Sequence, residues 1–124
     1  MKNENELMLE EWLQFAKDDL EAAKILLKET DNYHISVYHS HQAVEKLFKW
    51  FIIKRGQKFP FTHDLRVLFN LVCGLQNFKG LLEDILYLDN LYPQLRYPTG
   101  EKVSEEEAEK SLSITKTVFQ ALLL

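Results

Sequence analysis

The segment 33–56, YHISVYHSHQAVEKLFKWFIIKRG, carries the clearest structural pattern of the 124-residue chain. Its apolar stripe comprises Val37, Val44, Leu47, Phe48 and Phe51. This spacing predicts an amphipathic helix over about residues 33–54 that packs against other helices. The closing Lys-Arg-Gly favours a helix end there, because cations suit the negative end of the helix dipole and glycine can turn left-handed.

The segment before it predicts another long helix, over about residues 7–28. Its apolar residues recur at steps of three and four: Leu13, Ala16, Leu20, Ala23 and Leu27. The intervening ETDNY breaks this pattern, and Asp31 or Asn32 can accept hydrogen bonds from the free N–H groups of the next helix. A turn this short joins the two helices, each about 30 Å long, into an antiparallel hairpin.

Three further helices are expected after the hairpin. The first covers about residues 63–73 and follows Thr62 as its N-cap. The second covers about residues 81–96, with inward-facing side chains at Leu82, Ile85, Leu88 and Leu95. The last starts after Ser104, which forms a capping box with Glu107.

No segment shows the period-two alternation of a β-strand. The sequence therefore predicts an all-α fold, an up-and-down bundle of about five helices that includes the long antiparallel hairpin. A chain of this length suggests a single domain over residues 1–124.

Composition excludes several classes of protein. The single cysteine, Cys73, rules out an intramolecular disulfide, and its apolar surroundings suggest a small buried side chain. No apolar run reaches the ~18–20 residues of a membrane span, and no signal segment precedes the first helix. We therefore expect a cytoplasmic protein without membrane association. The net charge of −4 is too acidic for nucleic-acid binding by charge alone, although residues 45–66 hold six basic and two acidic residues.

Four polar residues of the segment 33–54 share one helical face and form a predicted polar seam: Tyr38, His41, Gln42 and Glu45. One interpretation is a hydrogen-bonded seam between packed helices. Another is a catalytic pair of His41 and Glu45, four residues apart. A di-iron site needs two Glu-x-x-His motifs and further carboxylates. Only one related motif occurs, Asp31-x-x-His34, so no metal site is expected.

Several short motifs, in this order, resemble the HEPN domain (higher eukaryotes and prokaryotes nucleotide-binding). They are Asp19-Leu20 with Ala23, Gln42-Ala43 with Glu45-Lys46, His63-Asp64-Leu65, and Arg96-Tyr97-Pro98. The resemblance extends from Trp12 to the last helix. It implies a helical bundle that commonly forms homodimers and is often paired with a minimal nucleotidyltransferase, as its substrate-binding subunit or in a toxin–antitoxin pair.

HEPN toxins are usually metal-independent ribonucleases that carry an arginine followed, after four to six residues, by a histidine. Here no histidine follows Arg96. The resemblance therefore favours a nucleotide- or nucleic-acid-binding protein that needs no cofactor over an enzyme. Two alternatives stay open: an endoribonuclease with a degenerate motif, in which Tyr97 and His63 transfer protons, and a purely structural dimerisation module.

Arg96 is the strongest candidate for a ligand contact, because a guanidinium is a rigid fork of donors suited to phosphate. Tyr97 can stack on a base or donate its hydroxyl. His63, Lys46 and Lys49 can add positive charge. The structural alternative for Arg96 is an ion pair with an acidic residue such as Asp19.

Overall fold

The computed structural model describes residues 1–96 and 102–124, with side chains described for residues 1–92 and 102–124. In these ranges the chain is helical and contains no strand, which confirms the predicted all-α class. The elements are α1 (Glu4–Glu29), α2 (Tyr33–Lys54), α3 (Leu65–Leu75), the 3-10 turn η1 (Lys79–Leu81), α4 (Leu82–Arg96) and α5 (Glu105–Leu122).

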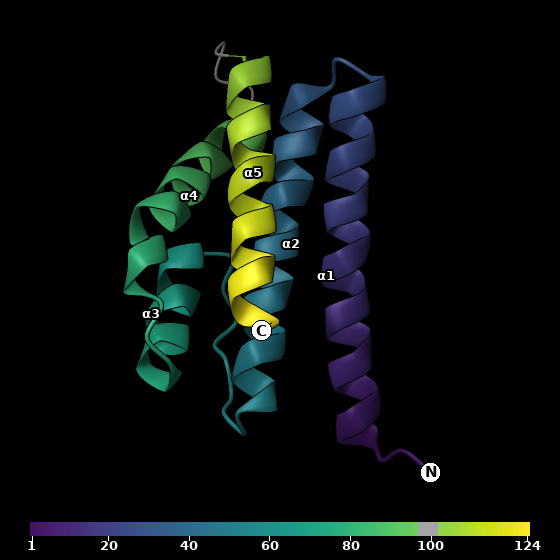
Figure 1. Ribbon diagram of the computed structural model, residues 1–124, viewed down its shortest axis with the longest axis vertical. Helices are drawn as coiled ribbons and strands as arrows, with labels where there is room; N and C mark the ends of the chain where they lie inside the picture. Colours follow the sequence, from purple (N-terminus) through teal and green to yellow (C-terminus); the bar gives the residue numbers. More distant parts are fainter. Residues whose placement is uncertain (97–101) are drawn as a thin grey trace.

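Helix α2 lies at the centre of the bundle and contacts each of the other four α-helices. Figure 1 shows α1 and α2 as the antiparallel hairpin expected from the sequence, with α5 beside α2 and the shorter α3 and α4 on the side away from α1. The central place of α2 explains why most of it is buried, including polar residues such as His41 and Glu45 that need partners inside the bundle.

The main core joins side chains of all five α-helices. Its largest fully buried members come from α2, α3 and α4: Phe48, Phe69, Leu47, Ile52, Leu65, Leu68, Ile85 and Leu88. Helix α1 contributes Ala16, and α5 contributes Val118, both fully buried. Most of the predicted α2 stripe, and Leu13, Ala16 and Leu20 of the α1 stripe, therefore face this core.

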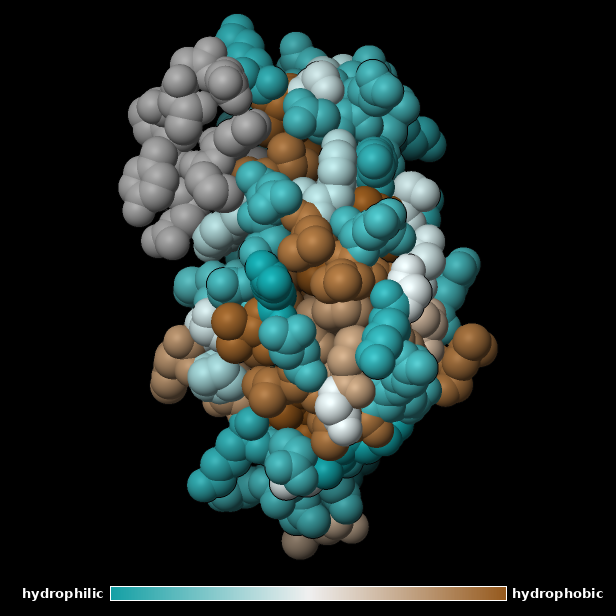
Figure 2. All heavy atoms as spheres, turned by 90° about the vertical axis from the view of Figure 1, so that its left-hand side faces the viewer, coloured by the Kyte–Doolittle hydropathy of each residue, from teal (hydrophilic) through white to brown (hydrophobic). Residues whose placement is uncertain are grey.

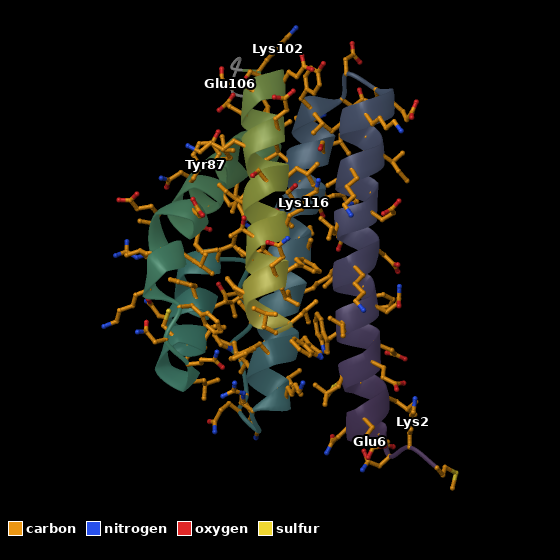
Figure 3. All side chains as sticks on the ribbon, in the orientation of Figure 1. Lys2, Glu6, Tyr87, Lys102, Glu106 and Lys116 are labelled. Atoms are coloured by element: carbon orange, nitrogen blue, oxygen red, sulfur yellow. The ribbon has the colours of Figure 1, made fainter. Side chains whose placement is uncertain are left out.

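A second, smaller core lies near the start of α2 and combines Val37, Leu91, Val103 and Ala108. Tyr87 of α4 packs against it and lies near the acidic first turn of α5 (Figure 3). Burial, followed by the nearby Glu107 and Glu106, raises the pKa of the Tyr87 hydroxyl above its ordinary value. The Lys110 ammonium lies 4.2 Å from the centre of the Tyr87 ring, in cation–π geometry.

The helix ends follow local sequence signals in part. The capping box of Ser104 and Glu107 is present with both hydrogen bonds, as predicted. Gly56 adopts a φ of +76° just after α2, again as predicted. At the start of α1, the Asn3 side chain accepts from the N–H of Glu6 and so caps the helix. Glu6 and Lys2 are labelled at this end of the bundle in Figure 3.

One predicted cap is wrong, and a second is right in position only. The N-cap of α3 is Asp64, whose carboxylate accepts from the N–H groups of Arg66 and Val67. The hydroxyl of Thr62 instead accepts from the Asp64 N–H. Asn32 occupies the N-cap position of α2, but neither its side chain nor that of Asp31 forms the expected capping bond; its backbone carbonyl accepts from α2 instead.

Leu82, which was expected to face inward, is 41% exposed because it lies at the junction of η1 and α4. Leu95 lies outside the described side chains. Cys73 is only partly buried, against the main core. Figure 2 shows hydrophobic side chains gathered in the middle of the face formed by α3 and α4. Val67 and Leu71 of α3 are each 40% exposed.

None of the helices in the described part of the chain combines the length and the hydropathy that a membrane crossing requires.

Candidate functional site

The predicted polar seam of α2 divides into a buried part and an exposed part. His41, Gln42 and Glu45 are 0%, 8% and 3% exposed, whereas Tyr38 is 39% exposed. Burial of a carboxylate and an imidazole is costly unless each finds a partner. The partners come from three directions: along α2, from the start of α3 and from α4.

Glu45 holds two basic groups. Its Oε2 accepts from the Lys49 ammonium at 3.0 Å, one turn further along α2. Its Oε1 accepts from Nδ1 of His63 at 3.1 Å, and His63 precedes α3. Because a carboxylate only accepts, Nδ1 of His63 carries the hydrogen and Nε2 is the nitrogen left for another partner. The His63 side chain is 60% exposed, so a buried acid orients an exposed imidazole.

The pair of His41 and Glu45 suggested by their spacing does not form. His41 instead faces α4, where its ring stacks on Tyr92 with centroids 4.1 Å apart and planes inclined by 20°. Its Nε2 lies 3.8 Å from Oδ1 of Asp89, beyond hydrogen-bond range. Within the described residues, neither ring nitrogen of His41 has a hydrogen-bond partner. His41 is therefore a fully buried imidazole held by stacking and by a nearby carboxylate.

The three rings of His41, Tyr92 and His63 form a series that we call the ring column. The Tyr92 and His63 centroids are 6.4 Å apart, with planes inclined by 30°. The column runs from a fully buried ring, through a half-buried one, to an exposed one. We call the ring column, together with Glu45 and Asp89 beside it, the α2–α4 site.

Asp89 connects α4 to the start of α3. Its Oδ1 accepts from the Leu65 N–H at 3.1 Å, which satisfies one of the free amides of α3. Burial raises the pKa of Asp89, but the nearby His41 ring, the Leu65 N–H and Asp64 lower it by more. The net pKa therefore lies below the ordinary value for aspartate, and the ionised form is the stabilised one.

A second charged cluster joins α1 to α2. The buried Asp19 accepts from the Lys46 ammonium at 2.6 Å and from Nδ1 of His39 at 2.8 Å. The same ammonium lies 5.9 Å from the centre of the Phe15 ring. Lys46 is therefore paired with α1, on a different side of α2 from His41.

Most cations of the basic segment lie against aromatic rings. The Lys49 ammonium is 5.6 Å from the Trp12 ring centre and 5.2 Å from that of Phe59. The Lys54 ammonium lies over the ring of Trp50, and the Arg55 guanidinium lies over the ring of Phe51, both on α2. Lys49 is 8% exposed and already pairs with Glu45. Most of the positive charges of residues 45–66 therefore contact aromatic rings or carboxylates of this same chain.

The predicted ligand residues are placed unequally. Arg96 ends α4, but its side chain lies outside the described residues, as does all of Tyr97. His63 lies at the α2–α4 site, and Lys49 reaches it only through Glu45. In the described part of the chain, no group of three His, Cys, Asp or Glu side chains could hold a metal ion.

Asp89 and Tyr92 were missed by sequence reasoning. Their spacing carried a usable signal, because Asp89, Tyr92 and Arg96 recur at steps of three and four and so share a helical face. Helical spacing within one segment gives no information about which other segment that face meets. The pairing of Asp89 with His41 therefore needed the fold.

Comparison with known proteins adds family information to this geometry. The HEPN domain model matches residues 9–123. MJ1304, a proposed toxin of Methanocaldococcus jannaschii, is 30% identical in an alignment of 127 positions that covers 90% of this chain and 83% of that protein.

Two crystal structures are similar in fold. TT1696 from Thermus thermophilus has a TM-score of 0.76 and 24% identity, covering 93% of this chain and 95% of its own. ST0689, an archaeal HEPN homologue, has a TM-score of 0.74 and 21% identity, covering 99% and 97%. At these identities the similarity supports the fold alone.

Proposed function

Because this chain belongs to the HEPN domain family, we propose that it binds a nucleotide or RNA at the α2–α4 site. We further propose that it acts as the substrate-binding or toxin–antitoxin-type partner of a small nucleotidyltransferase. Binding would use His63 and the C-terminal end of α4, where Arg96 and Tyr97 follow Tyr92.

The observation that carries this proposal is the orientation of His63. An imidazole that is 60% exposed is fixed through Nδ1 by a carboxylate that is 4% exposed. Burying the Glu45 carboxylate costs desolvation free energy, and the exposed His63 ring adds no packing to the core in return. It is typical of a site in which a buried group sets the direction of a side chain that contacts a ligand.

Arg96 supplies the proposed phosphate contact. It follows Tyr92 by four residues in α4, which places it on the same helical face by register. A guanidinium there can bind phosphate oxygens with two parallel hydrogen bonds. Lys46 and Lys49 are proposed as secondary contributors, because their ammonium groups pair with Asp19 and Glu45 and would act through their electrostatic field.

The test is binding of labelled single-stranded RNA and of ATP to the purified chain, by fluorescence anisotropy and calorimetry. Arg96→Ala should weaken binding about tenfold or more, as expected for loss of a charge-assisted contact. Arg55→Ala is the matched control, because Arg55 follows directly after α2, which ends at the opposite end of the bundle from the end of α4 (Figure 1), and it bonds to Gln76. Equal losses in both variants, or no binding by the wild type, would contradict the proposal.

An endoribonuclease is the second candidate, favoured by the paired His63 and Glu45. Nε2 of His63 could remove the proton of an RNA 2′-hydroxyl, whose oxygen then attacks the adjacent phosphorus. The departing 5′-oxygen would take a proton from an acid such as Tyr97, leaving a 2′,3′-cyclic phosphate and a 5′-hydroxyl. The similarity to the proposed toxin MJ1304 agrees with this candidate.

Incubation with a mixed RNA pool in EDTA separates the two candidates. Cleavage by the wild type, absent in both His63→Ala and Arg96→Ala, would support a metal-independent ribonuclease. Binding without cleavage would support the adaptor role. A third outcome, neither binding nor cleavage by a folded dimer, would leave the purely structural dimerisation module.

The proposed partners are a second copy of the chain and a small nucleotidyltransferase. An exposed aromatic position on α1, Phe15 at 53%, supplies apolar surface of the kind that interfaces use. Light scattering of the purified chain tests the homodimer. Co-purification with a nucleotidyltransferase encoded beside this chain tests the second partner, and failure of co-expressed proteins to associate would contradict it.

A further inference from the structure

We propose that the ring column is a stacking platform on which the exposed face of His63 holds one unpaired nucleobase. This inference rests on the proposed function and specifies its ligand. The nucleic acid must present the flat face of an unstacked base, as single strands and loops do and a continuous duplex does not.

The inner end of the column is buried and closely packed. His41 is fully buried and stacks on Tyr92 at 4.1 Å, and its nitrogens use no hydrogen bond within the described residues. Its position is therefore set by packing of the ring faces and by the Asp89 carboxylate, 3.8 Å from Nε2. A ring packed in this way gives Tyr92 a fixed surface on the core side.

The outer ring is held along its edge. Glu45 fixes Nδ1 of His63, and Glu45 is in turn held by Lys49, whose ammonium lies over the rings of Trp12 and Phe59. Each member of this chain of contacts except His63 is at least half-buried. The His63 ring is thus oriented before any ligand arrives, which lowers the entropy that binding would lose.

The geometry suits a base rather than a phosphate. Tyr92 lies toward one face of the His63 ring, at 6.4 Å, and 60% of the side chain is exposed. The carboxylates beside the column are the buried Glu45, which is paired with Lys49, and the partly buried Asp89, for which the structure shows no ammonium or guanidinium partner among the described residues; its negative charge disfavours an anion close to the column. A base has no net charge and presents a π-face, so it suits the exposed ring of His63 better than a phosphate does.

The experiment compares two ligands that differ only in their bases: a single-stranded oligoadenylate and an equally long oligomer of abasic ribose phosphate. Binding to the purified full chain is measured by fluorescence anisotropy at one fixed salt concentration. Variants are His63→Ala, which removes the ring, and His63→Phe, which keeps a ring but loses the bond to Glu45. Thermal unfolding and circular dichroism establish that each variant is folded.

Stacking predicts that His63→Ala weakens oligoadenylate binding about tenfold, whereas His63→Phe stays within about threefold of the wild type. On the abasic oligomer all three proteins should bind equally and more weakly. A blunt duplex of the same length should bind as weakly as the abasic oligomer.

Two results would overturn the platform while leaving nucleic-acid binding intact. One is equal binding of the oligoadenylate and the abasic oligomer by the wild type. The other is an equal loss in His63→Ala and His63→Phe, which would assign the effect to the imidazole nitrogens. Absence of binding to every ligand would overturn the proposed function and the platform together.

Discussion

His41 is a buried polar side chain that contributes mainly by its shape. It has no solvent exposure, and its ring stacks on Tyr92. Replacing His41 by alanine leaves a cavity, so we expect the free energy of unfolding to fall by about 2–4 kcal/mol. In His41→Phe, two effects oppose one another. The loss of two buried nitrogens without hydrogen-bond partners raises the free energy of unfolding by about 1–3 kcal/mol. Strain from the larger ring lowers it by about 1–3 kcal/mol. The Phe variant should therefore stay within about 1 kcal/mol of the wild type.

Urea unfolding at neutral pH measures both His41 variants. A loss in His41→Phe as large as that in His41→Ala would show that the ring nitrogens, and the carboxylate of Asp89 3.8 Å away, carry the stabilisation.

Asp89 should make stability depend on pH in the acid range. Its pKa is lowered in the folded protein by the His41 ring, the Leu65 N–H and Asp64, which together outweigh burial. A lowered folded-state pKa gives stability that is complete above the ordinary aspartate pKa, about 4, and is lost as the pH falls through the folded value. Asp89→Asn should therefore be less stable than the wild type at neutral pH, and this difference should shrink as the pH falls below about 4.

Thermal unfolding between about pH 6 and pH 2.5 tests this. Asp18→Asn is the control, because Asp18 is exposed and bonds only to Gln14 among the described contacts. A difference between Asp89→Asn and the wild type that stays constant with pH would contradict the assignment.

Single residues also mark the limit of sequence reasoning. Ser104 with Glu107 was predictable because a capping box is complete within four residues. Thr62 and Asp64 are both residue types that suit an N-cap. Asp64 is the N-cap because α3 starts two residues later than predicted, at Leu65. His63 was reached through a family motif, whereas its partner Glu45 was assigned to His41. The choice between those two partners depends on where the loop before α3 returns to α2.

At the scale of elements, the pairing of α1 with α2 has a charged contact within an apolar seam. Asp19 accepts from Lys46 and His39 and is 9% exposed. Removing it leaves two donors partly buried without their acceptor, so Asp19→Ala should lower the free energy of unfolding by about 1–3 kcal/mol. Asp18→Ala, one residue earlier on the exposed face, should change it by less than about 0.5 kcal/mol.

Denaturant unfolding of Asp19→Ala, Lys46→Ala and the double variant measures the coupling. The double variant should cost less than the sum of the two single variants. Strict additivity would mean that the Asp19–Lys46 contact does not stabilise the hairpin.

The start of α5 depends on one local motif. The Ser104 hydroxyl accepts from the Glu107 N–H, and the Glu107 carboxylate accepts from the Ser104 N–H. Ser104→Ala should lower the free energy of unfolding by about 1 kcal/mol. Ser113→Ala, on the exposed side of the same helix, is the matched control and should have almost no effect. Equal effects in both variants would indicate that helix propensity, and not the cap, sets the result.

The elements themselves were largely predictable, and their outer faces were not. The bounds of α2 follow from an apolar stripe and from Gly56, which are properties of one segment. Leu82 was assigned inward because it fits the spacing of Ile85 and Leu88, yet it is exposed because η1 precedes α4. Periodicity gives the direction of a face, but the neighbours that cover it are set by the path of the connecting chain.

At the scale of the whole molecule, the main core joins all five α-helices around α2, which favours a single cooperative unit. The smaller core shares α2, α4 and α5 with it, so neither can form without helices of the other. We therefore expect residues 1–124 to unfold in one transition. Tryptophan fluorescence reports on Trp12 and Trp50, in α1 and α2, and far-ultraviolet circular dichroism reports on every helix.

The two signals should have the same urea midpoint, and a core substitution distant from both tryptophans in sequence should shift them together. Leu88→Ala in α4 is such a change, because Leu88 is fully buried in the main core. Truncation of this side chain should lower the free energy of unfolding by about 2–5 kcal/mol and move the fluorescence and dichroism midpoints equally. If α3 and α4 unfolded separately, the dichroism midpoint would fall while the fluorescence midpoint stayed in place. The chain would then consist of a stable hairpin with α5 and a less stable pair of helices carrying Asp89 and Tyr92, and the α2–α4 site would open before the bundle does.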